Sequence, residues 1–335
     1  MTDLALVDRP SSVMLEQYLW PIKQYLAGEI TDLCINRPRE LWVKDASGWT
    51  RHAVPALTLE HCIRLATTIA SYRGKPKMPI LSATLPGGER AHVVSPPACE
   101  PNTVSISIRK PPVSDWTLDE LAAGGAFDLV ADVSQTLQPF EHELIALSQA
   151  RRIREFLDLS VRRHRNILIV GKTASGKTTI TRALSDSIPA GERIITIEDE
   201  HELFMRAHPN KVHLFYGRED ESGNHVTASQ ALAACLRMAP DRIWLAEIRG
   251  PEAWEYIKSI GTGHPGSIAT MHGNGAYEAF DQLGAHVKDS RTGAHLDIGY
   301  IKQRLVATID IVLYFNEYKL REIYYDPEAK GASLV

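Results

Sequence analysis

Apolar residues follow two different patterns along the chain, one before and one after residues 112–138. The first part has short segments in which apolar and polar residues alternate, which is typical of half-buried strands. The later part has continuous apolar runs separated by helix-like segments, which is typical of buried parallel strands. The change of pattern predicts a small α+β domain at residues 1–111, a linker at 112–138 and an α/β domain at 139–335.

The first domain is expected to contain two helices and several short strands. Ser12 is in position to cap a helix that runs to Leu19 and stops near Pro21, and a second, amphipathic helix is expected from Thr58 to Tyr72. The expected strands are Ile30–Asn36, Leu41–Lys44, Leu81–Leu85, Ala91–Val94 and Thr103–Arg109. Pro86-Gly87-Gly88 joins two of these strands as a hairpin.

The second domain is expected to be a largely parallel sheet with helices on both faces. A helical stretch runs from Pro139 to Phe156, and the linker before it has room for one short helix. The expected strands are Asn166–Val170, Arg193–Ile197, Ile243–Ala246, Ser267–Thr270 and Ile309–Phe315.

Composition restricts the class of protein. The hydrophobic share of 44% and the charged share of 23% are those of a soluble globular protein. No apolar run is long enough to cross a bilayer, and Met1–Pro10 lacks the apolar core of a secretory signal, so membrane association is expected to be peripheral. A net charge of -4 argues against a surface that coats nucleic acid. The four cysteines form no Cys-x-x-Cys pair, which indicates ordinary thiols in a reducing compartment.

The strongest chemical signal is Gly-Lys-Thr-Ala-Ser-Gly-Lys-Thr at residues 171–178, between a strand-like and a helix-like segment. Gly171 and Gly176 allow a tight turn whose backbone N–H groups face phosphate oxygens. Lys177 is expected to reach the β- and γ-phosphates, and the Thr178 hydroxyl is expected to ligate Mg²⁺. Ala174 stands where related loops often have glycine. The pattern predicts a P-loop nucleoside triphosphatase.

Acidic residues follow two of the expected strands. Ile194–Ile197 leads into Glu198-Asp199-Glu200, and Ile243–Ala246 leads into Glu247. Because ligands bind at the carboxyl ends of parallel strands, both groups are expected to face the nucleotide. Glu198 and Glu247 are the candidates for hydrolysis, while Asp199 and Glu200 have the alternative of capping or solvating a helix start.

Two histidines flank a glycine-rich turn and a short strand in residues 261–272. His272 is a candidate phosphate sensor, whereas for His264 a structural role is as good an interpretation. Without a third ligand nearby, the pair is not expected to bind a metal.

An arginine over the γ-phosphate is expected in a hydrolase of this kind. Five arginines are candidates: Arg249, Arg237, Arg242, Arg90 and Arg109. A solvated surface charge is the preferred interpretation for Arg237 and Arg242. Arg90 and Arg109 are better candidates, because each lies beside a hairpin or at a strand end.

The order of these motifs resembles the secretion (traffic) ATPases of type II secretion, type IV pili and type IV secretion. Gly171–Thr179 is similar to their Walker A motif, Thr196–Asp199 to the aspartate box, Arg242–Arg249 to Walker B, and Gly261–His272 to the histidine box. Ile35–Pro38 and Ser107–Pro111 extend the resemblance into the first domain. Pro139-Phe140-Glu141 and Pro209-Asn210 before a short strand resemble the smaller ATPase of type IV secretion and conjugation. The four-cysteine zinc module of the other branches is missing.

The resemblance implies a RecA-like ATPase domain, Mg²⁺-dependent ATP hydrolysis and a homohexamer with ATP between the two domains of each subunit. It further implies a role in substrate translocation and pilus biogenesis at the cytoplasmic face of the inner membrane, beside membrane components and a second ATPase or coupling protein. Glu247 would be the Walker B acid, Glu198 would assist the attacking water, and His272 would report the γ-phosphate. The nucleotide would contact Gly171, Ala174, Ser175, Gly176, Lys177, Thr178, Thr179, Arg90 and Arg109. Ala246 stands where many P-loop proteins have an aspartate, so the metal shell would rest on Thr178, water and more distant acids.

Three other functions are alternatives for a chain with these motifs. A GTPase is set aside, because Asn210-Lys211 is followed by Val212-His213 and not by the residues that read guanine. A DNA-translocating hexameric motor is opposed by the acidic balance and by the lack of an aromatic-basic stretch, so no direct nucleic-acid binding is expected. A non-enzymatic scaffold is opposed by intact Lys177 and Glu247.

Overall fold

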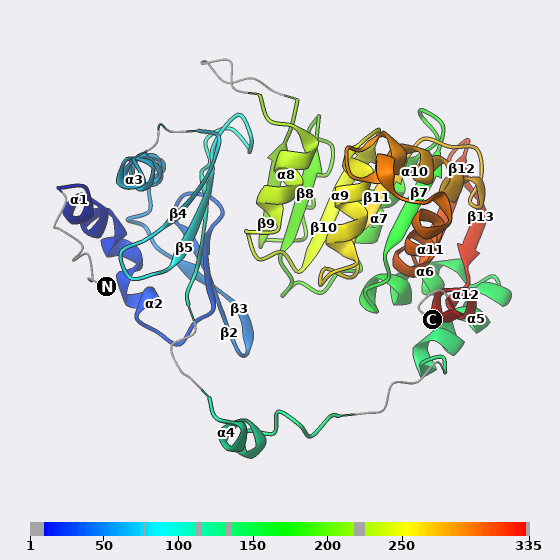
Figure 1. Cartoon of the computed structure of the whole chain (residues 1–335), viewed down its shortest axis with the longest axis horizontal. Helices are drawn as coiled ribbons and strands as arrows, with labels where there is room; N and C mark the ends of the chain where they lie inside the picture. Colours follow the sequence, from blue (N-terminus) through cyan, green and yellow to red (C-terminus); the bar gives the residue numbers. More distant parts are fainter. Residues whose placement is uncertain are drawn as a thin grey trace.

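The chain folds around two separate sheets, which lie side by side (Figure 1). The computed structural model describes residues 10–74, 76, 78–111, 116–130, 136–217 and 225–332. The expectation about a secretory signal concerns residues that lie almost entirely outside this described part. Parts of the expected linker, residues 112–115 and 131–135, lie outside it as well.

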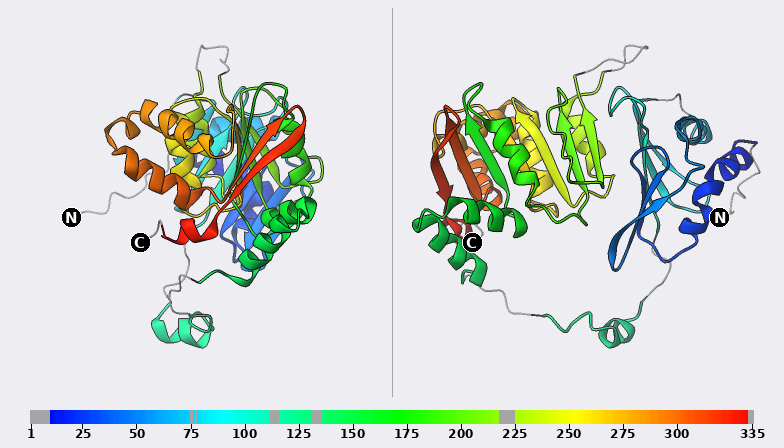
Figure 2. Two further views of the ribbon diagram at one scale, coloured as in Figure 1. Left: turned by 90° about the vertical axis from the view of Figure 1, so that its right-hand side faces the viewer. Right: turned by 180° about the vertical axis from the view of Figure 1, so that it is seen from behind.

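The first sheet has six antiparallel strands in the order β3-β2-β1-β6-β5-β4. They are β1 (Asp32–Ile35), β2 (Glu40–Asp45), β3 (Gly48–Ala53), β4 (Ile80–Thr84), β5 (Arg90–Val94) and β6 (Ser105–Arg109). Helices α1 (Pro10–Leu19) and α3 (Leu59–Tyr72) pack on the side away from the second sheet (Figures 1 and 2). Helix α3 confirms the amphipathic helix expected there, and Thr58 caps it, because its side chain accepts a hydrogen bond from the His61 N–H.

The chain does not leave the helical conformation at Pro21. It continues through a 3-10 turn, η1 (Trp20–Ile22), and a short helix, α2 (Lys23–Leu26). Proline is tolerated there because it stands at the start of the new turn, where its missing N–H has no intrahelical partner.

The second sheet has seven strands in the order β13-β12-β7-β11-β10-β8-β9. They are β7 (Ile167–Gly171), β8 (Ile194–Glu198), β9 (Lys211–Phe215), β10 (Arg242–Ile248), β11 (Ile268–Met271), β12 (Ile311–Asn316) and β13 (Lys319–Tyr325). All neighbours are parallel except β12 and β13, which form an antiparallel hairpin. This confirms the predicted α/β architecture with a smaller α+β part before it.

Helices cover both faces of the second sheet. One face carries α5 (Pro139–Gln149), α6 (Ile153–Arg162) and α7 (Lys177–Ser185). The other carries α8 (Ala228–Cys235), α9 (Glu252–Ile260), α10 (Glu278–Asp289) and α11 (Ile298–Thr308). Along β7, Ile167 and Ile169 join the first core, while Leu168 and Val170 join the second. This double burial explains why the strand is a continuous apolar run.

The helical stretch expected at residues 139–156 is two helices. Arg151 takes a left-handed φ of 57° between them and ends α5. The remaining helical pieces are α4 (Leu118–Ala123), η2 (Gly293–His295) and α12 (Pro327–Ala332). The short helix α4 is the one expected in the linker, and it lies apart from both sheets (Figures 1 and 2).

The two parts of the chain meet at strand β9, the edge of the second sheet. Asn36 donates to Asn210 Oδ1 at 3.0 Å and accepts a hydrogen bond from Arg193 at 2.7 Å. Trp49 and Lys44 both bind the Asp241 carboxylate, at 2.9 and 2.8 Å. These polar contacts hold the first sheet against the edge of the second. Among the described residues, no helix is long and apolar enough to span a membrane.

Candidate active site

The phosphate-binding loop connects β7 to α7, as the sequence predicts. Gly171 has to be glycine, because a Cβ atom there would lie 2.4 Å from the Phe315 carbonyl oxygen. Gly176 takes a left-handed φ of 100°, and Ala174 takes one of 57° without being glycine. Loops of this conformation turn successive N–H groups toward one point, where they bind anions.

Lys177 is folded back into this loop. Its Nζ donates to the carbonyl oxygens of Gly171 and Lys172, at 2.8 and 3.0 Å. Burial lowers the pKa of Lys177, and the charge of Glu247 partly offsets that effect. Ser175 is also buried, and its Oγ has no hydrogen-bond partner among the described residues. An unpaired buried hydroxyl next to a lysine fits a loop that receives a phosphate group.

Thr178 and Thr179 follow Lys177 in the first turn of α7, where backbone N–H groups lack intrahelical acceptors. The Thr178 hydroxyl donates to Glu202 Oε2 at 2.9 Å. Because the donated hydrogen points at Glu202, the lone pairs of the hydroxyl oxygen stay available to a cation. This donor set fits Mg²⁺ held by Thr178, with Glu202 orienting the hydroxyl.

Charged side chains from three adjacent strand ends form one network beside this loop. Glu247 of β10 contacts Arg249 Nε at 2.5 Å and His272 Nε2 at 2.8 Å. Arg249 also forms an ion pair with Asp199, which follows β8. Because β8, β10 and β11 are parallel neighbours, their carboxyl ends bring these residues together. The alternative interpretation of Asp199 and Glu200 as helix-capping residues is wrong, since no helix begins among residues 199–210.

A register irregularity in β10 helps to place Glu247. Leu245 pairs with Ala269 and Ile248 pairs with Met271, so β10 carries one more residue than β11 over the same span. The Ala246 carbonyl oxygen in this segment accepts a hydrogen bond from the Thr270 hydroxyl at 2.6 Å. Such an extra residue re-aims a side chain, and here it lies directly before the carboxylate.

Glu198 differs from Glu247, because its side chain is fully buried. Its Oε2 accepts the N–H groups of Glu202 and Leu203, both at 2.8 Å. Its Oε1 contacts the Thr196 hydroxyl at 2.5 Å and His213 Nδ1 at 3.1 Å. Burial alone would raise the pKa of Glu198, but these hydrogen bonds lower it. Both oxygens are therefore occupied, and the geometry supports a positioning role for Glu198 more than direct contact with the attacking water.

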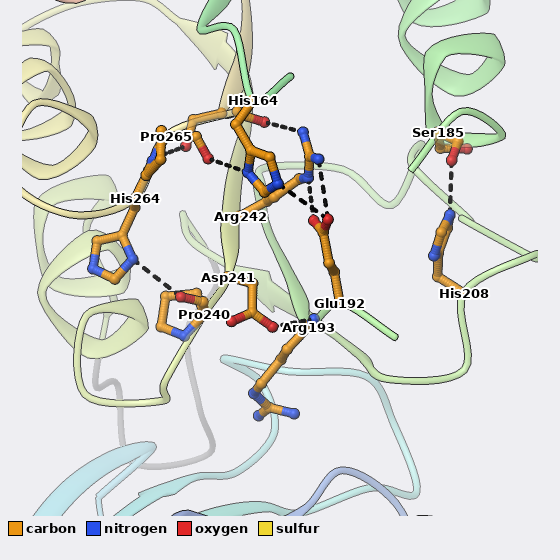
Figure 3. Close-up of polar contacts among 12 residues, drawn as sticks. His164, Ser185, Glu192, Arg193, His208, Pro240, Asp241, Arg242, His264 and Pro265 are labelled. Atoms are coloured by element: carbon orange, nitrogen blue, oxygen red, sulfur yellow. Dashed lines mark hydrogen bonds and ion pairs between the residues drawn. The ribbon is translucent and has the colours of Figure 1, made fainter. Parts of the chain in front are cut away.

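His264 and His272 lie at opposite ends of the strands of the second sheet. His264 Nδ1 contacts the Pro240 carbonyl oxygen at 3.0 Å, and burial lowers the pKa of His264 (Figure 3). Pro240 precedes β10, so His264 is at the amino ends of the strands while His272 is at the carboxyl ends. The structural interpretation of His264 therefore applies.

Arg242 is not the solvated charge that the sequence indicated. It is fully buried, and its guanidinium group forms a two-pronged contact with Glu192 at 2.5 and 3.3 Å (Figure 3). His164 Nε2 contacts the same carboxylate at 3.2 Å. Burial alone would raise the pKa of Glu192, but the bonds and charges of His164 and Arg242 lower it to about 2. This cluster is structural.

The first-domain arginines are not brought to the phosphate loop of the same chain. Arg90 and Arg109 are paired neighbours on β5 and β6, and they line a cleft of 510 Å³ together with Arg237, which follows α8. Arg109 also forms an ion pair with Asp32 at 2.8 Å. Its far wall follows α8, which packs against β8 and β9, and β9 is four strand spacings, roughly 19 Å, from β7. Contact between these arginines and the phosphates therefore requires a domain rearrangement or a second copy of the chain.

Two residues of the site were not predicted from the sequence. Glu202 stands four residues after Glu198 in an acidic run, which was the available signal, but the irregular loop that returns it to Thr178 has no periodic pattern. Tyr318 lies in the β12–β13 turn, and its N–H donates to the Ser175 carbonyl oxygen at 3.0 Å. Only the tertiary fold brings this turn over the phosphate loop.

Comparisons with known proteins agree with this geometry. The family described as "Type II/IV secretion system protein" matches residues 133–312. The type IV secretion system protein VirB11 of Brucella suis is 41% identical over 98% of this chain and 94% of its own length. PtlH of Bordetella pertussis is 40% identical over 91% of each chain. The crystal structure of the Brucella suis VirB11 ATPase with sulphate superposes with a TM-score of 0.91, at 40% identity, over 97% of this chain and 98% of that one. The chain therefore belongs to the type II/IV secretion system protein family, among its secretion ATPases.

Proposed function

We propose that this ATPase hydrolyses Mg²⁺-ATP at the phosphate loop to drive type IV secretion or conjugative transfer. The observation that carries the proposal is the network Asp199–Arg249–Glu247–His272 at the carboxyl ends of three adjacent strands beside Lys177. It provides a carboxyl group and an imidazole where the γ-phosphate of a bound nucleotide is expected.

Each group of residues in the site has a separate role in this proposal. The loop N–H groups and Lys177 bind the β- and γ-phosphates and hold them in line for attack by water. Thr178 ligates Mg²⁺, which neutralises charge on the phosphate oxygens. Glu247 orients the attacking water, and His272, in contact with the same carboxylate, responds to the γ-phosphate. Glu198 acts through the backbone of residues 202–203, which carries Glu202 to Thr178.

We further propose the coupling of this site to transport. The working form is a homohexamer bound peripherally at the cytoplasmic face of the inner membrane, next to membrane components and a second ATPase or coupling protein. It takes part in substrate translocation and pilus biogenesis. Residues 1–111, 112–138 and 139–335 act as first domain, linker and ATPase domain, and Arg90 and Arg109 reach a nucleotide when the domains or subunits rearrange. The likeness to VirB11 and PtlH along nearly the whole chain supports this proposal.

The test is phosphate release by the purified full chain, measured together with its mass by light scattering in Mg²⁺-ATP. A mass of six subunits with turnover that depends on Lys177 agrees with the proposal. A stable monomer with the same turnover contradicts the ring but leaves the ATPase. Strong stimulation by single-stranded DNA would instead favour a nucleic-acid motor.

A further inference from the structure

Three potential metal ligands from both parts of the chain meet at the interface beside β9. Glu100 comes from the segment between β5 and β6, His201 from the loop after β8, and His213 from β9 itself. Each offers one ligand atom, and these atoms all lie within 4.8 Å of one another. Glu100 and His201 are half-buried and His213 is buried. The cluster does not include His264 or His272, the pair considered from the sequence.

Backbone pairing between the two parts of the chain places Glu100 there. Cys99 forms an isolated antiparallel bridge with Leu214, and the Phe215 N–H donates to the Ala98 carbonyl oxygen at 2.9 Å. In antiparallel register the residue after Cys99 lies opposite the residue before Leu214. Glu100 is therefore directly across from His213, on the same face, without any adjustment of the backbone.

The surroundings of His213 are those of a metal-binding imidazole. Its Nδ1 lies 3.1 Å from Glu198 Oε1 and 2.7 Å from the Thr196 hydroxyl. A buried carboxylate next to Nδ1 favours the tautomer that carries its proton there, which leaves Nε2 as a free electron pair. Metal-binding histidines in proteins commonly have such a carboxylate behind them, which orients the ring and raises its basicity.

Two other features of the cluster bear on this interpretation. The His201 and His213 rings also stack, with centroids 4.6 Å apart at 44°, so part of their proximity is ordinary aromatic packing. Packing of these rings does not account for the carboxylate of Glu100. The nearby Lys211 ammonium group donates to the Met205 carbonyl oxygen at 2.7 Å, and the charge of Glu100 partly offsets the lowering of the Lys211 pKa by burial.

We propose that Glu100, His201 and His213 bind one Zn²⁺ ion between the first domain and the edge strand of the second sheet. Two imidazoles and one carboxylate suit zinc, with a water molecule in the fourth position. Ligand atoms around tetrahedral zinc are about 3.3 Å apart. Side-chain rotations that move the ligand atoms by about 1 Å would therefore bring them to coordination distance. The bound ion joins the first domain to β9.

The same site is connected to the phosphate loop through hydrogen bonds. His213 contacts Glu198, Glu198 accepts the N–H of Glu202, and Glu202 accepts the Thr178 hydroxyl. An ion on His213 therefore stabilises the ionised Glu198 and the loop that positions Glu202. The inference goes beyond the proposed ATPase activity and does not depend on it.

The test uses the full-length chain, freed of metal with a chelator and assayed without nucleotide. Co²⁺ is titrated as a probe, because its visible absorption reports tetrahedral coordination, and Zn²⁺ is then used to displace it. We expect one ion per chain for the unaltered protein and a rise in the thermal unfolding midpoint with Zn²⁺. Glu100→Gln and His201→Gln should each weaken binding by at least about tenfold.

Two control variants locate the ion. His295→Gln removes an exposed histidine elsewhere, and His272→Gln removes the imidazole that contacts Glu247. Both should bind Zn²⁺ like the unaltered protein. Loss of binding in His272→Gln with retention in Glu100→Gln and His201→Gln would place the ion at the phosphate site and overturn the proposal, as would failure of the unaltered chain to bind any ion. Unchanged unfolding midpoints of the variants in metal-free buffer show that a loss is not caused by misfolding.

Discussion

Glu247 and His272 face each other across two neighbouring parallel strands, with Oε1 and Nε2 2.8 Å apart. Neither residue is near the other in the sequence, and the pairing of β10 with β11 brings them together. The other oxygen of Glu247 contacts Arg249. The Glu247 carboxylate is thus held between two hydrogen-bonding partners, which fixes the orientation of its two oxygens.

Replacing Glu247 by Gln should preserve ATP binding and remove turnover. The amide keeps the size of the side chain but loses the negative charge that orients the attacking water. We expect phosphate release to fall at least about 10²-fold, which is the usual contribution of a positioned acid or base. ATP binding, followed with a fluorescent analogue, should change less than threefold. Unchanged turnover would show that another residue has this role.

Lys177→Ala should abolish hydrolysis for a different reason. The ammonium group binds the loop carbonyls of Gly171 and Lys172, and we propose that it binds phosphate oxygens when a nucleotide is present. Its removal should weaken nucleotide binding as well as turnover, each by about 10²-fold or more. A matched control is Lys172→Ala, an exposed lysine in the same loop, which should retain most activity. Equal losses in both variants would argue against a specific role for Lys177.

Glu202→Gln should raise the Mg²⁺ concentration needed for half-maximal turnover. The Glu202 carboxylate accepts the hydrogen of the Thr178 hydroxyl at 2.9 Å, which would orient the lone pairs of that hydroxyl toward the proposed Mg²⁺. Loss of such an orienting partner typically weakens metal binding by about 10- to 100-fold. The maximal rate at saturating Mg²⁺ should fall much less. A loss of maximal rate with an unchanged Mg²⁺ requirement would contradict this role.

Glu192 should make the stability of the fold sensitive to acid. Its pKa falls from 4.5 to about 2 in the folded chain, so its stabilising effect is complete above pH 4.5 and is lost as the pH falls toward 2. The contribution is at most about 3 kcal/mol, less what solvent screening removes. Urea unfolding of the unaltered protein and of Glu192→Gln should differ most near neutral pH. The difference in their free energies of unfolding should shrink below pH 4.5. A difference that stays constant with pH would show that ionisation of Glu192 does not cause the acid sensitivity.

Local sequence accounts for much of the architecture. The apolar runs at residues 167–170 and 194–197 are buried on both sides, and this requires a parallel sheet covered by helices. Strand β13 was missed, because Lys319–Tyr325 is half polar and the turn before it has no glycine or asparagine. Glu317 and Tyr318 both take left-handed φ angles in that turn, 51° and 59°, which sequence patterns rarely predict for such residues.

The sequence by itself determined the phosphate loop, because its glycines and Lys177 act through local backbone geometry within eight residues. It also indicated Glu247 and His272, since each follows a recognisable buried strand. Only the tertiary fold decided that Glu198 is fully buried and that Arg242 is buried in contact with Glu192. It also decided that Glu100 lies close to His213. Burial and contacts between distant residues depend on strand order and register, and these are set by the packing of the whole chain and not by neighbouring residues.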